Sequence, residues 1–153
     1  MVTFAAAVLL HIFPAQAQDL LALKIAATPT KQVEWTLGEL DELDQVTFTT
    51  STIWTDGKVT FSGVPLKTII NKVLDGGTNI QLTALNDYSV AIPIDELEDG
   101  VPIVATRIDG KKIAVRDKGP YWLVYPYDSD PRYRTELVYA RSIWQLNRIK
   151  LLD

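Results

Sequence analysis

The sequence predicts an α+β domain, rich in β-strand, in which two main helices pack against about eight strands. Three observations lead to this class. Residues 63–74 carry apolar side chains at helical spacing, residues 46–54 alternate with the period of a strand, and Asp109-Gly110 separates two short apolar runs as hairpin turns do. Helices and strands do not alternate regularly, which argues against a doubly wound fold.

The first helix is expected to begin at Thr36. Thr36 and Glu39 have the spacing of a capping box, in which each side chain accepts a hydrogen bond from the other residue's backbone N–H. Leu37, Leu40 and Leu43 follow at near-helical spacing. This short helix is expected to pack its leucines into the core.

The next two elements are a strand and the longer helix. A strand is predicted over residues 46–54, with one face made of Val46, Phe48, Thr50, Thr52 and Trp54. The second helix is expected to begin at Gly63-Val64-Pro65 and to end before Gly76-Gly77. Its apolar stripe predicts core packing and consists of Leu66, Ile69, Ile70, Val73 and Leu74.

The rest of the chain has the pattern of strands and tight turns. One helical turn is expected at residues 94–97. Strands are expected at residues 80–85, 88–92, 101–108, 112–115 and 121–125, with at least one more between 137 and 151.

The N-terminal segment predicts export. Residues 2–13 are almost wholly apolar and are followed by Pro-Ala-Gln-Ala, with small residues where a signal peptidase reads the chain. Residues 1–17 are therefore expected to be a signal peptide and residues 18–153 the mature domain, periplasmic or secreted. The apolar run is shorter than the roughly 20 residues of a spanning helix, so no stable membrane insertion is expected after cleavage. A membrane anchor and a buried N-terminal segment remain the alternatives.

Composition excludes several kinds of chemistry. The chain has no cysteine, and its one histidine, His11, lies within the predicted signal peptide. The mature domain therefore lacks the residues for a zinc finger, an iron–sulfur site or a nucleophile activated by histidine. Its formal net charge is −4 and its basic residues are spread among acids, so a nucleic-acid partner is not expected.

Three groups of polar residues are candidate ligand contacts, and each has a structural alternative. Arg116 and Lys118 form a cationic loop that suits a small anionic ligand, or a solvated turn with an internal ion pair at Asp117. Asn86 and Asp87 suit the mouth of a pocket, or simply a turn. A second basic group either converges with Arg116 or lies on separate exposed faces, and it comprises Arg132, Arg134 and Arg141.

Four segments in order resemble the molybdopterin-binding domain of the sulfite oxidase family. They are residues 61–66 (FSGVPL), 86–93 (NDYSVAIP), Asp109-Gly110 and residues 119–126 (GPYWLVYP). The similarity runs from about residue 46 to residue 149, most of the mature domain. It implies a mixed, β-rich fold of the sulfite-oxidase type and makes molybdopterin the candidate cofactor.

The resemblance also shows where this chain departs from the family. A family cysteine that binds molybdenum corresponds to Thr50 or to Ser51, depending on whether Trp54 is aligned with a family tryptophan. Neither hydroxyl replaces a thiolate. Trp122 stands where the family commonly has an arginine that faces the pterin. Thr50 and Ser51 with Trp54 as a stacking face are candidates to line a polar pocket; alternatively the threonines simply suit a strand.

Three hypotheses for function follow. The favoured one is an exported binding or accessory domain whose former cofactor pocket holds another small ligand, anionic or pterin-like. The second is a molybdopterin enzyme or subunit that holds the cofactor through pterin contacts only. The third is an interaction module for a membrane sensor or a redox protein, which would have no buried polar pocket. A cavity shared by Thr50, Trp54, Arg116 and Arg141 would weaken the third.

Overall fold

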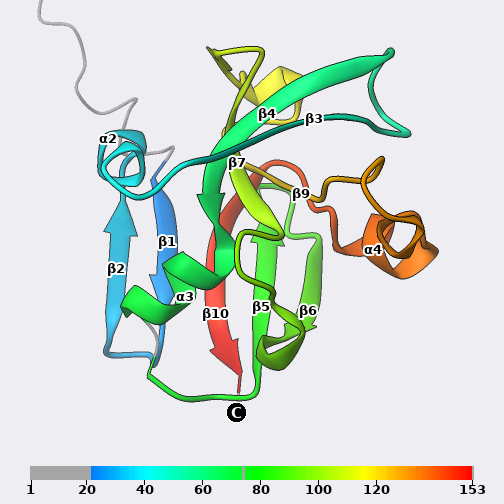
Figure 1. Cartoon of the computed structure of the whole chain (residues 1–153). Helices are drawn as coiled ribbons and strands as arrows, with labels where there is room; N and C mark the ends of the chain where they lie inside the picture. Colours follow the sequence, from blue (N-terminus) through cyan, green and yellow to red (C-terminus); the bar gives the residue numbers. More distant parts are fainter. Residues whose placement is uncertain (1–21, 74, 153) are drawn as a thin grey trace, which may run out of the picture.

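The structure is a computed structural model that describes residues 22–73 and 75–152. Within those residues the chain is α+β, as predicted, with its strands in two sheets (Figure 1). The strands are β1 (Leu23–Ala26), β2 (Gln32–Trp35), β3 (Val46–Ser51), β4 (Lys58–Pro65), β5 (Asn79–Ala84), β6 (Ser89–Pro93), β7 (Ile103–Ile108), β8 (Lys111–Lys112), β9 (Trp122–Val124) and β10 (Leu146–Leu152). The helices are α2 (Leu37–Asp41), α3 (Leu66–Val73) and α4 (Glu136–Arg141), with 3₁₀ turns η1 (Ile94–Glu96), η2 (Val115–Asp117) and η3 (Pro131–Tyr133).

The first sheet brings the two ends of the described chain together. Its strand order is β2-β1-β10-β5-β6, and β1 runs parallel to β10 while the other neighbours are antiparallel. The last strand of the chain therefore lies in the middle of this sheet. Strands β1 and β2 fall in a stretch for which the sequence predicted no element.

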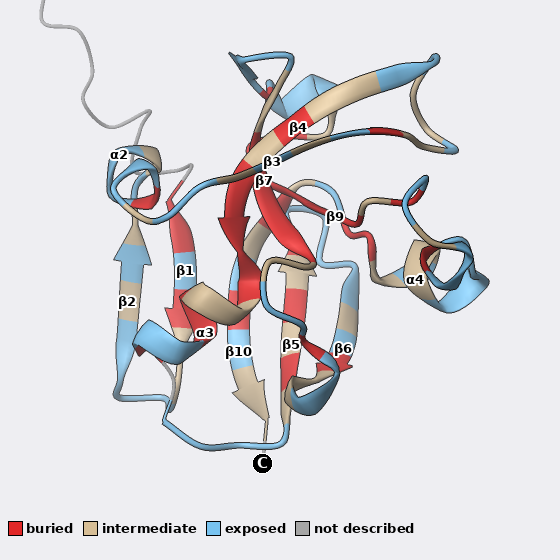
Figure 2. Cartoon of the chain, viewed as in Figure 1, coloured by how far each residue is buried: buried red, intermediate tan, exposed pale blue. Residues whose placement is uncertain are grey.

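The second sheet has the order β3-β4-β7-β8, and β9 pairs with β7. Strand β4 leaves its hairpin with β3 and runs down into the core, so its second half is buried (Figure 2). Gly63 allows this close approach, because a Cβ at that position would lie 2.0 Å from the carbonyl oxygen of Val104 on β7.

Helix α2 confirms the predicted capping box. Glu39 N–H donates to the hydroxyl of Thr36, and Thr36 N–H donates to the Glu39 carboxylate at 2.7 Å. Helix α3 also forms and buries Leu66, Ile69, Ile70 and Val73 of the predicted stripe, whereas Leu74 lies outside the described residues. The helix begins at Leu66 rather than at residues 63–65. Those three residues complete β4 because they pair with β7.

Two further differences from the predicted elements have local causes. Strand β3 ends at Ser51 instead of Trp54, because the Thr52 hydroxyl accepts hydrogen bonds from the N–H groups of Trp54 and Thr55 and so forms a turn. The stretch after residue 135 begins with helix α4, which the sequence did not predict. Thr135 caps it by accepting a hydrogen bond from Val138 N–H.

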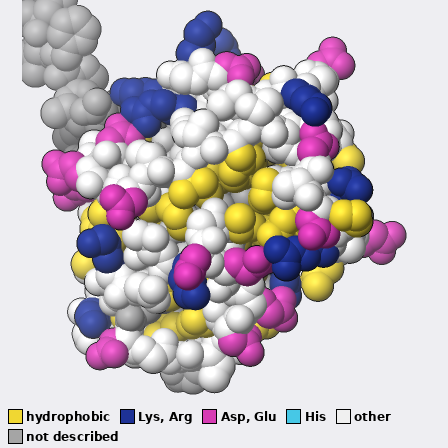
Figure 3. Space-filling view, in the orientation of Figure 1, with side chains coloured by type: hydrophobic (Ala, Val, Ile, Leu, Met, Phe, Trp, Pro, Cys, Tyr) yellow, Lys and Arg dark blue, Asp and Glu magenta, His cyan; other side chains and the backbone are white. Residues whose placement is uncertain are grey.

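The core consists of two clusters of buried side chains. The larger lies between the first sheet and α3, and the smaller joins the second sheet around Phe61 and Trp122. On the face shown in Figure 3, hydrophobic side chains gather across the middle, and positive and negative side chains are interspersed around them.

The predicted signal peptide, residues 1–17, lies outside the described residues. Among the helices that the structure describes, none is long and apolar enough to cross a membrane.

Candidate functional site

A cavity of about 280 Å³ lies beside α4, between the β3–β4 loop and the β5–β6 turn. Segments far apart in the sequence supply its walls, which are mostly apolar and aromatic. The lining residues are Trp54, Ala84, Asn86, Tyr88, Tyr139, Ala140, Ser142, Ile143 and Trp144. Pockets for drug-sized ligands have volumes of roughly 300–1,000 Å³, so this cavity suits a smaller molecule.

Trp54 is the centre of the aromatic wall. Its ring makes edge contacts with four other rings, at centroid distances of 5.8 Å to Trp122, 6.3 Å to Tyr127, 5.8 Å to Tyr139 and 5.6 Å to Trp144. Edge-to-face contacts at such distances are favourable for aromatic rings. They fix the orientation of Trp54, so its ring is a preformed wall of the cavity.

Ser142 fixes the segment that follows α4. Its hydroxyl donates to the carbonyl of Val138 at 2.8 Å and accepts a hydrogen bond from the phenol of Tyr127 at 2.6 Å. Its own carbonyl accepts from the indole N–H of Trp122 at 3.2 Å. These three bonds are buried or partly buried, and they hold the cavity wall that begins at Tyr139.

The two tyrosines behind this wall are neutral at physiological pH. Burial raises the pKa of Tyr127 well above its ordinary value, although the bond to Ser142 opposes the shift. Burial likewise raises the pKa of Tyr125, which packs against Tyr127 with ring centroids 6.3 Å apart. Neither group is suited to act as a base.

Of the two site residues predicted in the β5–β6 turn, Asn86 lines the cavity and Asp87 does not. Asn86 lines the cavity, and its side-chain oxygen accepts from Tyr88 N–H at 3.2 Å. Asp87 points away to an ion pair with Arg148 on β10. The turn therefore presents an amide and a phenol to the cavity rather than a carboxylate.

Thr50 and Ser51 form hydrogen bonds with Asp128 instead of lining the cavity. The Thr50 side chain is fully buried; its hydroxyl accepts from Asp128 N–H at 3.0 Å and donates to the Ser51 carbonyl at 3.1 Å. Ser51 donates to the Asp128 carboxylate from its hydroxyl at 2.6 Å and from its N–H at 2.8 Å. These bonds from Ser51, with Lys58 nearby, lower the pKa of Asp128. Neither residue lines the cavity.

The η2 loop separates its two cations. Arg116 is highly exposed and its guanidinium lies 3.7 Å from Asp117. The ammonium of Lys118 lies 5.7 Å from the ring centroid of Trp122 and 5.8 Å from that of Trp144, which lines the cavity. Only Lys118 is therefore beside the aromatic wall.

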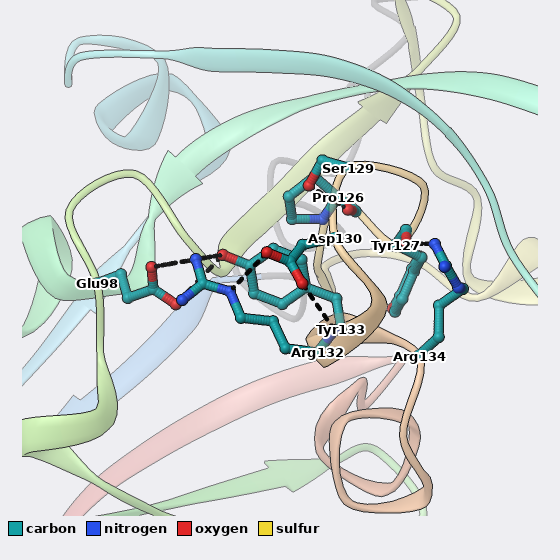
Figure 4. A network of polar contacts seen from close by, with 8 residues as sticks. All are labelled: Glu98, Pro126, Tyr127, Ser129, Asp130, Arg132, Tyr133 and Arg134. Carbon is teal, nitrogen blue, oxygen red and sulfur yellow. Dashed lines mark hydrogen bonds and ion pairs between the residues drawn. The ribbon is translucent and has the colours of Figure 1, made fainter.

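The remaining arginines do not converge with Arg116. Arg141 pairs with Glu96 at 2.5 Å, on the η1 turn. Arg132 pairs with Glu98 at 3.0 Å, and Arg134 donates to the carbonyl of Tyr127 at 2.8 Å; the two side chains point in different directions in Figure 4. These contacts fasten the 126–134 loop and α4 to the rest of the domain.

The sequence did not predict the cavity's α4 wall. The sequence pattern does not indicate a site role for Tyr139, Ala140 or Ile143. The signal that was present is the pair Thr135-Glu136, which has the N-cap and acidic first turn of a helix.

A molybdenum cofactor does not fit the residues in place. The chain has no thiolate to offer, the hydroxyl of Thr50 is committed to Asp128 and Ser51, and Trp122 is a buried core ring. Among the described residues, no group of three or more histidine, cysteine, aspartate or glutamate side chains is placed to hold a metal ion.

Comparison with known proteins supports the fold. No family model matches the sequence, and no curated protein matches it. Among solved structures, the sulfane dehydrogenase SoxCD from Paracoccus pantotrophus is similar, with a TM-score of 0.66 and 14% identity over 89% of this chain. The match covers 39% of the SoxCD chain. At this identity the likeness shows the fold alone, and it agrees with the sulfite-oxidase-type fold expected from the sequence.

Proposed function

We propose that this chain is an exported, non-catalytic binding or accessory domain whose cavity takes a small planar heteroaromatic molecule, such as a pterin ring. One observation carries the proposal: Trp54, Tyr139 and Trp144 stand around a cavity of about 280 Å³ with the Asn86 amide at its edge. Flat aromatic walls bind a flat ring by stacking, and an amide adds a donor and an acceptor for ring nitrogens and carbonyls. The missing thiolate supports binding rather than redox catalysis.

Titration with pterin tests the proposal. Binding of 2-amino-4-hydroxypteridine is measured by isothermal titration calorimetry on the mature domain. Removing one stacking ring by Trp144→Ala is expected to weaken binding roughly tenfold to a hundredfold, because such a ring contributes about 1–3 kcal/mol. Trp144 is 38% exposed, so the domain is expected to stay folded without it.

Trp35→Phe is the matched control. Trp35 lies on β2 and does not line the cavity, so its removal is expected to leave the affinity unchanged. Circular dichroism on both variants checks that the fold is retained. Absence of saturable binding, or equal affinity in the wild type and Trp144→Ala, would overturn the proposal.

A further inference from the structure

Lys118 is held in place by its backbone. It follows η2 with a left-handed conformation, φ 79°, and its carbonyl accepts a hydrogen bond from Gln145 N–H at 2.9 Å. The next residue, Gly119, has no room for a side chain, because a Cβ would lie 1.8 Å from the carbonyl oxygen of Ile113. The backbone of Lys118 is therefore fastened to the segment that carries Trp144.

The Lys118 ammonium has no acidic partner among the described residues. Its contacts are the faces of Trp122 and Trp144. The charged side chains of its loop and of the cavity turn form other pairs, Arg116 with Asp117 and Asp87 with Arg148. A cation thus lies beside the aromatic wall, and among the described residues no carboxylate lies within ion-pair distance of it.

The backbone conformation makes this placement informative. Left-handed φ is unfavourable for residues with a Cβ, and glycine adopts it without that penalty. A lysine with this φ therefore has a strained backbone, and strained backbone conformations are common at ligand-binding sites. Attraction between the ammonium and the tryptophan faces offsets the strain only in part, since the side chain is partly exposed.

We propose that Lys118 makes the cavity selective for a planar heteroaromatic molecule that carries an anionic substituent. The ring stacks in the cavity, and the substituent extends past Trp144 to pair with the ammonium of Lys118. This inference rests on the proposed function: the proposed function specifies a planar ring as the ligand, and the inference adds that the ring carries a negative charge.

Two probes that differ by one carboxylate separate charge from stacking. The affinities of pterin and pterin-6-carboxylate are measured by calorimetry for the wild type and for Lys118→Met. The wild type is expected to bind the carboxylate about tenfold more tightly, because a charge-assisted hydrogen bond is added, and added salt is expected to reduce the difference. In Lys118→Met the two affinities are expected to become equal, with that for pterin unchanged.

Two more variants complete the test. Lys111→Met removes a positive charge from an exposed position on β8 and is expected to keep the wild-type preference. Lys118→Gly removes the cation and the backbone strain together, so it is expected to unfold at no lower temperature than the wild type and yet lose the preference.

The outcomes distinguish this inference from the function on which it rests. Equal binding of both probes by the wild type, or a preference that survives in Lys118→Met, overturns the role of Lys118 and leaves ring binding intact. Absence of saturable binding by either probe overturns the proposed function and the inference with it.

Discussion

Replacing Thr50 by valine tests whether this residue is structural. The two side chains have nearly the same shape, so Thr50→Val removes the hydroxyl from a fully buried position with little change in packing. The Asp128 N–H then loses its acceptor and the Ser51 carbonyl loses a donor. An orphaned group costs about 1–3 kcal/mol where it stays shielded from water, so we expect the free energy of unfolding to fall by about 2 kcal/mol.

Urea unfolding followed by tryptophan fluorescence measures this loss. With a slope of about 2 kcal/mol per molar urea, a loss of about 2 kcal/mol lowers the unfolding midpoint by about 1 M. Thr49→Val is the matched control on the same strand: its hydroxyl bonds that of Thr60 at 2.8 Å on the exposed side, and the expected change is within about 0.5 kcal/mol.

The comparison of the two valine variants decides the role of Thr50. Equal midpoints for Thr50→Val and Thr49→Val would refute the reasoning, because the buried hydroxyl would then contribute nothing that an exposed one does not. Since Thr50 does not line the cavity, pterin binding by the folded Thr50→Val variant is expected to match the wild type.

Two other predictions concern stability. Burial raises the pKa of Tyr121 to about 12, whereas an unfolded tyrosine ionises near pH 10; the unfolded chain therefore binds fewer protons above pH 10, and the free energy of unfolding is expected to fall between pH 10 and 12. Urea midpoints across this range should fall less steeply in Tyr121→Phe, and an unchanged slope would contradict the assignment. Gly63→Ala is expected to destabilise the domain by about 3 kcal/mol or more, because its Cβ meets the backbone of Val104. Gly38→Ala, in helix α2 with only an ordinary contact at 3.8 Å, is expected to stabilise it by up to about 1 kcal/mol; similar thermal midpoints for the two variants would refute the packing argument.

Local signals predicted the elements whose stability is local. The capping box at Thr36, the apolar stripe of α3 and the Asp109-Gly110 turn each depend on residues a few positions apart, and all three are present. The turn has positive φ at both residues, 50° and 77°, as a tight hairpin requires. The same signals misplace boundaries where a distant partner competes, as at residues 63–65, which pair with β7.

The candidate site was predicted only in fragments. Trp54 and Asn86 line the cavity and Lys118 lies beside it, whereas Thr50, Asp87 and Arg141 bond elsewhere. The type of each residue indicated that its side chain can form a hydrogen bond, an ion pair or a stacking contact. It did not indicate which partner lies close to that side chain in the folded chain.

By itself, the sequence determined which chemistry residues 18–153 have available: with no cysteine and no histidine after His11, neither thiolate nor imidazole is present. It also determined the α+β class through periodicity. Only the tertiary structure decided that β1 pairs with β10, that Asp128 N–H donates to the hydroxyl of Thr50, and that the rings of Trp54 and Trp144 are in contact. The physical reason is that periodicity reflects neighbouring residues, whereas contacts between distant segments are set by the packing of the whole chain.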